Sequence, residues 1–463
     1  MPPHDKVDGA AIPQTGVGRR TASLRRMTAL LKSHALMAYA ARAVAMAASF
    51  GLSIAVARTM STGNAGRFFA VLALVNGAAT IGRFGLDNLA LREVSVGNVG
   101  GARALRLTLL PSSAFSALSA VVAALLSTIF IGPLTVEQRT VVLVAAALTV
   151  PASALAVLSG AIHRAQGRIG TGTFAELGST PILAIAGLLA LFWPHHLLDV
   201  PQAWSIYCIS AWLTAIWSMA ALHRAHEPQM ANGAEQAGGQ PSLGQRAFLR
   251  HNWRSLVSFM ATSLSFYLLT WAPVLILGAF GSADQTAYYN VAARVAAFVG
   301  IVPSIQASYL SPVFARLYAT RQLSELGRLA SAASLKAGLV GLVVILPILI
   351  APDAVLGIFG GRYLDARSSL YALSAAALIQ VLLGPLIPLM MTCHLEAPAS
   401  YLTTLTVVLT FGIGALVSRH GAGALALVTA SLNVTYSVAC LILLMRLGIK
   451  TSVLVPLKGH RDV

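Results

Sequence analysis

The sequence predicts an all-α protein that crosses a membrane about twelve times, and three observations support this fold class. Apolar residues make up 57% of the chain and charged residues only 10%, whereas soluble domains carry roughly 25% charge. The mean hydropathy is +0.75. Continuous apolar runs recur along the chain between short polar breaks, and many reach the roughly 20 residues that cross a bilayer. Continuous runs, rather than alternating ones, argue against a membrane β-barrel.

The expected spans fall into two groups of six on either side of a polar stretch. In chain order they cover residues 34–57, 68–86, 107–132, 140–161, 171–193 and 203–222, and then 254–279, 286–309, 334–359, 368–392, 399–418 and 421–445. The stretch between the groups contains "AHEPQMANGAEQAGGQPSLGQ", which is polar, glycine-rich and typical of a linker. The resulting organisation is a basic tail (1–33), a six-helix bundle (34–224), a linker (225–253), a second six-helix bundle (254–446) and a C-terminal tail (447–463).

The basic residues predict the orientation. If the N-terminus is cytoplasmic, the inside segments hold 23 Lys and Arg residues against six outside, and three arginines remain within spans. This asymmetry follows the positive-inside rule and puts both termini in the cytoplasm, which requires an even number of spans. It also explains most of the net charge of +17 without a nucleic-acid partner.

The chain carries no recognisable catalytic or metal-binding motif. It lacks a Gly-Lys-Ser/Thr phosphate loop, and its glycine-rich stretches open expected membrane helices, where small residues serve helix packing. Cys208, Cys393 and Cys440 lie within or at the end of spans, without a metal-ligand spacing, and are interpreted as packing residues. We therefore expect no enzymatic activity, no metal and no cofactor.

Two arginines lie deep within expected spans. Arg42 is about eight residues from the cytoplasmic start of the first span, and Arg294 is about eight residues from the outer start of the eighth. At 1.5 Å per residue, each lies about 12 Å deep, where insertion scales give an arginine a cost of roughly 3 kcal/mol. Arg42 shares a helical face with Ser49, and Arg294 shares one with Asn290. We expect these polar faces to line an interior cavity.

Few carboxylates are available to neutralise these charges. Glu176 in the fifth span is the obvious buried acid, and one carboxylate cannot neutralise two arginines. Arg83 is shallower, and an ion pair with Asp87 at i+4 is an alternative to a substrate-binding role for it. We expect a cavity with net positive charge, which suits a phosphate or diphosphate because a guanidinium binds such groups through two parallel hydrogen bonds. Glu176, and after it Asp87, are the candidates for taking up a coupling H⁺ or Na⁺.

His163 and Arg164, in "AIHRAQGR", stand at the cytoplasmic end of the fourth span. Both are candidates for meeting an anionic substrate as it enters. The alternative is that they form part of the ordinary basic flank of a membrane helix.

Two corresponding turns suggest that the halves are related. "ARTMSTGNAGRFFAVLA" at 57–73 and "GAFGSADQTAYYNVAAR" at 278–294 each contain a helix end, a small turn and a helix that begins with an aromatic pair. Two halves of the same topology are a common transporter plan, with the substrate site near the midplane between them.

Several stretches, in order, resemble one family. "VARTMSTGNAGRFFAVLALVNGAATIGRFGLDNLALREVS" (56–95) resembles the opening of bacterial polysaccharide repeat-unit flippases. "TAYYNVAARVAAFVGIVPSIQASYLSPVFARL" resembles their eighth helix, and "LGIFGGRYLDARSSLYALS" (356–374) resembles their ninth-to-tenth loop. The family belongs to the multidrug, oligosaccharidyl-lipid and polysaccharide exporter superfamily, and the resemblance covers roughly 34–450.

The resemblance implies a function. The family moves an undecaprenyl-diphosphate-linked oligosaccharide across the bacterial inner membrane by alternating access, for O-antigen, capsule or exopolysaccharide synthesis, and can work with a polysaccharide polymerase and a chain-length regulator. Its members often carry cavity arginines in the first and eighth helices, which Arg42 and Arg294 match by location. Three alternatives remain at this stage: a multidrug or organic-cation exporter, a peptidoglycan-precursor flippase and a polysaccharide polymerase.

Overall fold

The computed structural model describes residues 40–192, 197–231 and 244–449, and the expected N-terminal tail lies outside them. The described residues are almost entirely helical and contain no strand. Eleven helices in them are long and apolar enough to cross a membrane. The chain is therefore a multi-pass membrane protein, and the expected fold class is confirmed.

The helices of the first half run up to the end of the sixth expected span. They are the first helix (Ala40–Thr59), α2 (Thr62–Arg83), α3 (Leu86–Ser95), α4 (Gly101–Ile131), α5 (Val136–Ala165), α6 (Ile169–Thr173), the π-helical turn η1 (Phe174–Gly178), α7 (Ser179–Phe192) and α8 (Val200–Ala231).

The second half begins with the longest helix of the described chain. Its elements are α9 (Gln245–Phe280), α10 (Ala283–Ala296), η3 (Ala297–Gly300), α11 (Ile301–Ala319), α12 (Leu323–Ile350), α13 (Pro352–Gly357), η4 (Gly361–Ala366), α14 (Arg367–Leu383), α15 (Leu386–Thr392), α16 (Glu396–Val417), η5 (Ser418–His420) and α17 (Ala422–Arg446).

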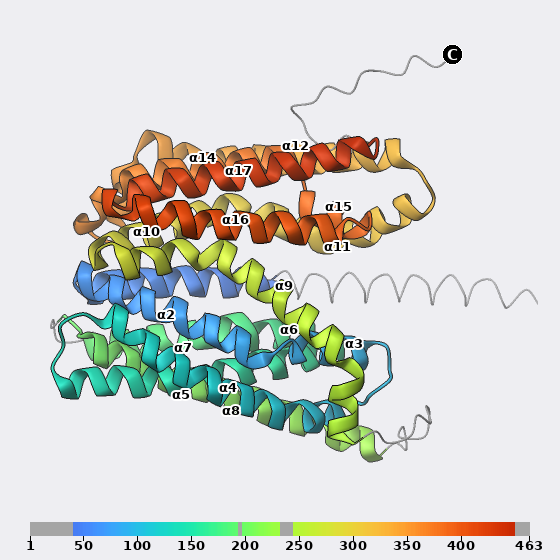
Figure 1. The fold of residues 1–463 in the computed structure, drawn as a ribbon, viewed down its shortest axis with the longest axis horizontal. Helices are drawn as coiled ribbons and strands as arrows, with labels where there is room; N and C mark the ends of the chain where they lie inside the picture. Colours follow the sequence, from blue (N-terminus) through green and yellow to red (C-terminus); the bar gives the residue numbers. More distant parts are fainter. Residues whose placement is uncertain (1–39, 193–196, 232–243, 450–463) are drawn as a thin grey trace, which may run out of the picture.

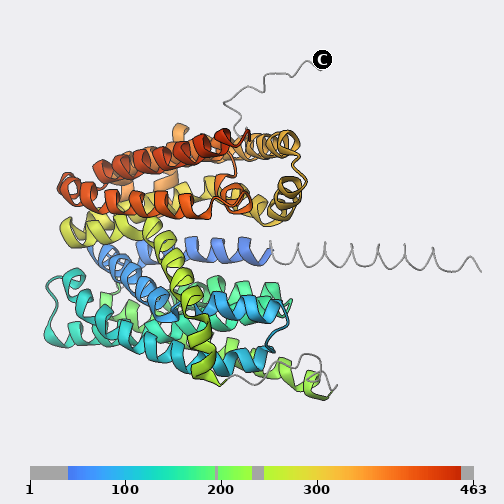
Figure 2. The ribbon, with the colours of Figure 1, turned by 45° about the vertical axis from the view of Figure 1, so that its right-hand side comes forward.

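The two halves form two layers of roughly parallel helices. In Figure 1 the helices α2 to α8 lie below and α10 to α17 lie above, while α9 crosses from one layer to the other. The first helix lies between the layers in both views (Figures 1 and 2). Contacts between the halves therefore centre on the first helix, α2, α9 and α10.

Most spans match the sequence prediction, and three departures have local causes. The eighth expected span, 286–309, is divided into α10 and α11 by the 3₁₀ turn η3, a break that often marks a hinge. The ninth ends at Ile350 rather than 359, because Pro352 begins the separate helix α13. The tenth ends at Leu383, where Gly384 has a φ of +116°.

The expected linker, 225–253, was too long at both ends. Helix α8 extends to Ala231, and α9 already begins at Gln245. The arginine-rich segment before 254 is thus the first part of α9 rather than a linker, because its apolar positions recur at helical spacing and are buried against the first half.

The two corresponding turns have the same local structure. Ser61 caps α2 by accepting a hydrogen bond from the Asn64 amide, and Ser282 caps α10 by accepting one from the Gln285 amide. A serine N-cap satisfies a helix-start amide that would otherwise lack a partner. We call the end of the molecule with these two caps the turn end, and the opposite end, where α8 ends and α9 begins, the linker end.

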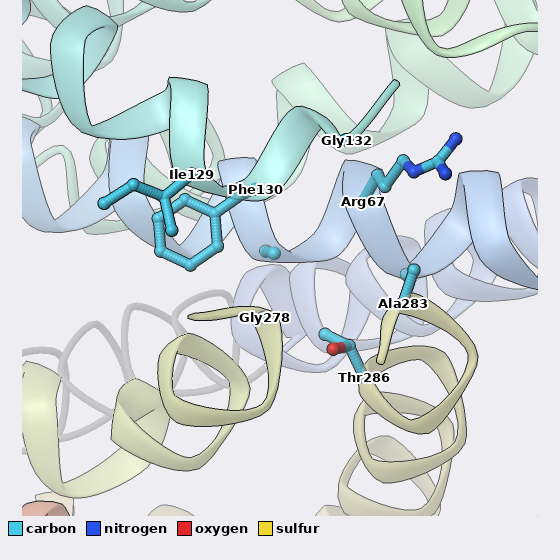
Figure 3. A pocket seen from close by; sticks show the side chains of 9 residues that line it. Arg67, Ile129, Phe130, Gly132, Gly278, Ala283 and Thr286 are labelled. Atoms are coloured by element: carbon cyan, nitrogen blue, oxygen red, sulfur yellow. The ribbon is translucent and has the colours of Figure 1, made fainter. Parts of the chain in front are cut away.

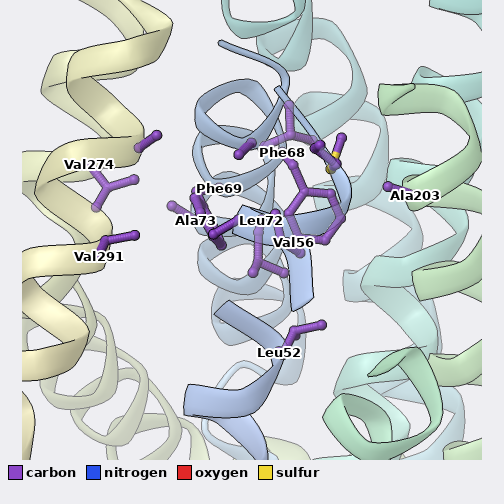
Figure 4. Packing of buried hydrophobic residues seen from close by; sticks show 14 of the residues in the cluster. Leu52, Val56, Phe68, Phe69, Leu72, Ala73, Ala203, Val274 and Val291 are labelled. Atoms are coloured by element: carbon purple, nitrogen blue, oxygen red, sulfur yellow. The ribbon is translucent and has the colours of Figure 1, made fainter. Parts of the chain in front are cut away.

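Helix α2 is the centre of the main core. Its most apolar window is 72% buried, against 28% for α9. In Figure 4, Phe68, Phe69 and Leu72 of α2 lie between Val274 and Val291 on one side and Ala203 on the other, so α2 packs on both halves. This places the neighbouring first helix and α10 against the same central seam.

Candidate functional site

Arg294 lies at the junction of the two halves. Its Nη1 donates a hydrogen bond of 3.3 Å to the Ser49 hydroxyl of the first helix. The guanidinium carbon lies 4.8 Å from the ring centroid of Trp271 in α9, a cation–π contact. Among the residues that the structure describes, no carboxylate forms an ion pair with Arg294, so its charge is held by a hydroxyl and an aromatic ring.

Asn290 completes this site on the same face of α10. It lies one turn before Arg294, as expected, and its side chain is only 2% exposed. Within the described chain its Nδ2 has no hydrogen-bond partner. A buried amide donor without a partner costs about 1–3 kcal/mol, so Arg294 and Asn290 together offer donors to an oxygen-rich ligand.

Aromatic side chains surround the Arg294 guanidinium. Tyr267 lies one turn before Trp271, the two rings are stacked at 6.2 Å, and the Tyr267 hydroxyl donates to the Ala73 carbonyl of α2. Tyr207 of α8 also lies near Arg294. These residues were not predicted from the sequence, although the i, i+4 spacing of Tyr267 and Trp271 marks a shared helical face.

A second group of charges lies within the first half. Arg164 of α5 forms an ion pair with Glu176, and Arg83 forms one of 3.3 Å with Asp87. All four side chains are about 13–25% exposed. Arg164 also interacts electrostatically with Asp87, Arg83 and Arg42, so these residues, which come from five elements, lie near one another.

The local backbone brings Arg164 to Glu176. A Cβ on Gly160 would lie 2.8 Å from the Gly172 carbonyl oxygen, and one on Gly172 would lie 2.7 Å from Arg164 Cγ. The two glycines therefore let α5 and α6 approach closely. Glu176 lies in the π-helical turn η1, a rare element that is frequent at functional sites.

The predicted arginines lie at different levels along the molecule. Arg42 is exposed and is seven residues before Ser49 in the same helix, which separates them by about 10 Å along the axis. Arg294 lies near the middle of the molecule, and Arg42 lies closer to the linker end. Together with Arg42, the two groups carry four arginines and two carboxylates, a net charge of +2.

Three expectations about individual residues are now more precise. Glu176 is the partner of a third arginine, Arg164, and neutralises neither Arg42 nor Arg294. Asp87 forms an ion pair with Arg83, which was the alternative to a substrate-binding role for that arginine. His163 does not line an entrance: it is fully buried, with Nε2 3.1 Å from the Ser218 carbonyl oxygen of α8, because it points into the α5–α8 contact.

The halves are closed against each other at the turn end. Arg58 of the first helix donates hydrogen bonds of 2.8 and 2.9 Å to the carbonyls of Gly357 and Ile358. Phe50 makes edge-to-face contacts with Phe298 and Phe359, at 4.5 and 5.4 Å. These contacts hold the first helix against the second half.

A small pocket remains within this closure. It lies between α2, the last turn of α4, the end of α9 and the start of α10, and Figure 3 shows Arg67, Phe130 and Thr286 in its wall. Its volume is about 180 Å³, whereas pockets for drug-sized ligands measure roughly 300–1,000 Å³. This pocket is too small to hold an oligosaccharide.

Comparisons with known proteins agree with this fold. The profile of a family described as "Polysaccharide biosynthesis protein" matches residues 32–318. A search of curated proteins finds no match.

Solved transporter structures are similar to the chain over most of its length. The lipid II flippase MurJ, in an inward closed conformation, has a TM-score of 0.63 at 10% identity, covering 89% of this chain and 87% of MurJ. A MOP superfamily transporter from Pyrococcus furiosus, whose binding pocket is described as having reverse polarity, has a TM-score of 0.55 at 15% identity. The match covers 90% of this chain and 96% of that transporter. An inward-facing multidrug resistance transporter of the MATE family has a TM-score of 0.53 at 16% identity, with 89% and 98% covered. At these identities the similarity establishes the fold.

Proposed function

The chain belongs to the polysaccharide biosynthesis protein family, and we propose that it is the flippase that moves a lipid-diphosphate-linked oligosaccharide from one leaflet of the membrane to the other. Family and fold support a membrane transporter. The proposal adds the substrate: the diphosphate and glycan of an isoprenoid-linked repeat unit, crossing the bacterial inner membrane from the cytoplasmic to the outer leaflet.

The observation that carries this proposal is the Arg294 site. Its guanidinium has no carboxylate partner within the described residues, is held by Ser49 and Trp271, and lies beside the unsatisfied amide of Asn290. A fixed positive charge with free donors is complementary to a diphosphate. An organic cation would instead require unpaired carboxylates, and both interior carboxylates are paired with arginines.

The position of Arg42 supports a stepwise path. Arg42 is exposed near the linker end, and the orientation predicted from the basic residues makes that end cytoplasmic. With the turn end closed, the substrate enters from the cytoplasmic side, meets Arg42 and Arg164 first and then reaches Arg294. The lipid tail stays in the bilayer, because an unshielded diphosphate could not cross hydrocarbon, where isolated ions cost tens of kcal/mol in the Born limit.

The proposal also includes the coupling ion. A diphosphate that binds Arg164 competes with Glu176 for the same guanidinium. The released carboxylate then binds H⁺ or Na⁺, which links ion movement to substrate binding. Asp87 would act in the same way if Arg83 were drawn to the substrate. A polysaccharide polymerase and a chain-length regulator are the expected partners at the outer face.

The test replaces Arg294 in a strain whose own copy of the gene is deleted. We expect Arg294→Glu to abolish surface polysaccharide and to trap complete lipid-linked repeat units in the inner leaflet. Arg294→Lys keeps the charge but loses the bidentate geometry and should retain part of the export. Membrane protein levels are measured by immunoblot, and Arg139→Glu, an exposed arginine at the turn end, is the matched control.

Each outcome separates the candidate functions. Normal export by Arg294→Glu, at normal protein levels, would refute the proposed site. Unchanged polysaccharide in the deletion strain together with altered drug resistance would indicate a multidrug exporter. Loss of viability with accumulated peptidoglycan precursor would indicate a peptidoglycan-precursor flippase.

A further inference from the structure

Helix α9 is longer than a membrane span requires. Its 36 residues extend about 54 Å at 1.5 Å per residue, against a hydrocarbon core of about 30 Å. Its last turns pack on α10 and α16 in the second half, and its first turns lie at the linker end against the first half. The first three turns of α9, residues 245–257, therefore lie at the surface of the membrane or beyond it.

These first turns are amphipathic. Phe248, Asn252 and Leu256 recur every four residues and are buried, and the first and last of them belong to an apolar cluster of the first half. On another face, Arg246, Arg250 and Arg254 recur at the same spacing, and all three are exposed. We call this row of three arginines the basic ledge.

The basic ledge has no internal counter-charge. In residues 40–192, 197–231 and 244–449, none of its three guanidiniums takes part in an ion pair. The start of α9 is joined to α4, because the Gln245 side chain donates a hydrogen bond of 3.0 Å to the Leu107 carbonyl. Arg106 of α4, next to Leu107, is also exposed and adds a further positive charge at this end of the molecule.

Two arginines at the turn end, unlike those of the basic ledge, have partners within the chain. Arg367 pairs with Asp353, and Arg58 bonds two backbone carbonyls. The three guanidiniums of the basic ledge are exposed, aligned at one helical spacing and without an ion-pair partner in the described residues. They are therefore free to bind an anion outside the protein.

Trp253 identifies the surroundings of that anion. It follows Arg250 by three residues and is 51% exposed. Its ring centroid lies 5.2 Å from that of Phe84, and the Phe84 ring stacks on Phe115 of α4 with a centroid distance of 4.7 Å. Val257, one turn further, is 38% exposed. The row of arginines ends beside an exposed tryptophan, and an exposed valine follows one turn later; this order matches the transition from headgroups to acyl chains, where tryptophan concentrates in membrane proteins.

We propose that the basic ledge of α9 binds the headgroups of anionic phospholipids in the leaflet at the linker end, with Trp253 at the level of the acyl-chain boundary. Basic residues on an amphipathic helix beside a membrane span are attracted to anionic lipid. Since α9 packs on both halves, bound lipid anchors the element that joins them. The inference does not depend on which substrate the protein carries.

The test uses the purified full-length protein in a neutral detergent, titrated with dioleoyl-phosphatidylglycerol or dioleoyl-phosphatidylcholine and read by native mass spectrometry. We expect the wild type to retain phosphatidylglycerol preferentially. The triple variant R246Q/R250Q/R254Q should bind it more weakly by on the order of 100-fold, at about fivefold per arginine. R246K/R250K/R254K, which keeps the charge, should retain the preference.

Two controls make the test specific. R139Q/R362Q/R419Q removes the same charge from exposed arginines at the turn end and should leave lipid retention at the wild-type level. Trp253→Phe, compared with the wild type in vesicles of brominated lipid, isolates the fluorescence of Trp253, which we expect brominated phosphatidylglycerol to quench more than brominated phosphatidylcholine. Equal retention of both lipids by the wild type, or full phosphatidylglycerol retention by a folded R246Q/R250Q/R254Q, would overturn the proposal.

Discussion

Gly66 lets the backbones of α2 and α10 approach closely at the turn end. A Cβ built on Gly66 would lie 1.7 Å from the carbonyl oxygen of Ala283 and 2.6 Å from its carbonyl carbon. Real Cβ atoms essentially never come within 3.0 Å of a heavy atom from a residue that is not adjacent in the chain. In Gly66→Ala, α2 and α10 must therefore move apart by more than an ångström, because the obstacle is backbone and cannot rotate away.

The cost of this overpacking is about 1–3 kcal/mol. It applies only while the turn end is closed, since Gly66 and Ala283 belong to different halves. The equilibrium between a closed and an open turn end should therefore shift toward the open state by roughly 5- to 150-fold, at tenfold per 1.4 kcal/mol. The fold of each half should be unaffected, because alanine is the better helix former by about 1 kcal/mol.

The assay is a distance distribution between spin labels at Val136 and Arg362, which are exposed and lie in opposite halves at the turn end. The three buried native cysteines are first replaced. We expect Gly66→Ala to add or enlarge a population at longer distance. Gly412→Ala in α16, where a Cβ would meet nothing within 4 Å, should leave the distribution unchanged. If Gly66→Ala gave the wild-type distribution, the contact with Ala283 would not control closure.

Two further predictions concern polar contacts. Arg58→Gln removes two hydrogen bonds to carbonyls at the end of α13, worth about 1 kcal/mol each in this exposed position. The distance between the same two labels should therefore shift in the same direction as in Gly66→Ala but by less. A wild-type distribution would show that this contact does not hold the two halves together at the turn end. Glu176→Gln frees Arg164 from its ion pair, so calorimetry with inorganic pyrophosphate should show severalfold tighter binding and transport should lose its ion dependence. Unchanged affinity and unchanged ion dependence would contradict the exchange of Arg164 between Glu176 and the substrate.

The helices themselves could be predicted from the sequence because their formation is local. Within a bilayer, each span must satisfy its own backbone hydrogen bonds, so a long apolar run becomes a helix whatever surrounds it. The small turns at 57–73 and 278–294 were recognisable for a similar reason, since a serine cap acts within three residues. Errors arose where one residue overrides hydropathy, as Pro352 and Gly384 do.

The depth of Arg294 and its lack of an acidic neighbour in the sequence were also sufficient to indicate a site. Its partners were not. Ser49 is 245 residues away from it, and the i, i+4 spacing of Tyr267 and Trp271 marks a helical face of α9 without showing that this face meets Arg294 of α10. Whether Glu176 would meet Arg42, Arg294 or Arg164 depended on the close approach of α5 and α6 at Gly160.

The sequence by itself thus determined which segments form long apolar helices and how deep within them the charges lie, because both follow from one-dimensional patterns of apolar residues; it predicted about twelve spans, and the described residues contain eleven helices long and apolar enough to cross a membrane. Only the tertiary structure decided which charges meet, that His163 is buried against α8, that the turn end is closed, and that Arg246, Arg250 and Arg254 form an exposed row on α9. The physical reason is that each of these depends on the packing of helices distant in the chain, and in a membrane that packing is set by close contact and specific polar partners rather than by hydrophobicity.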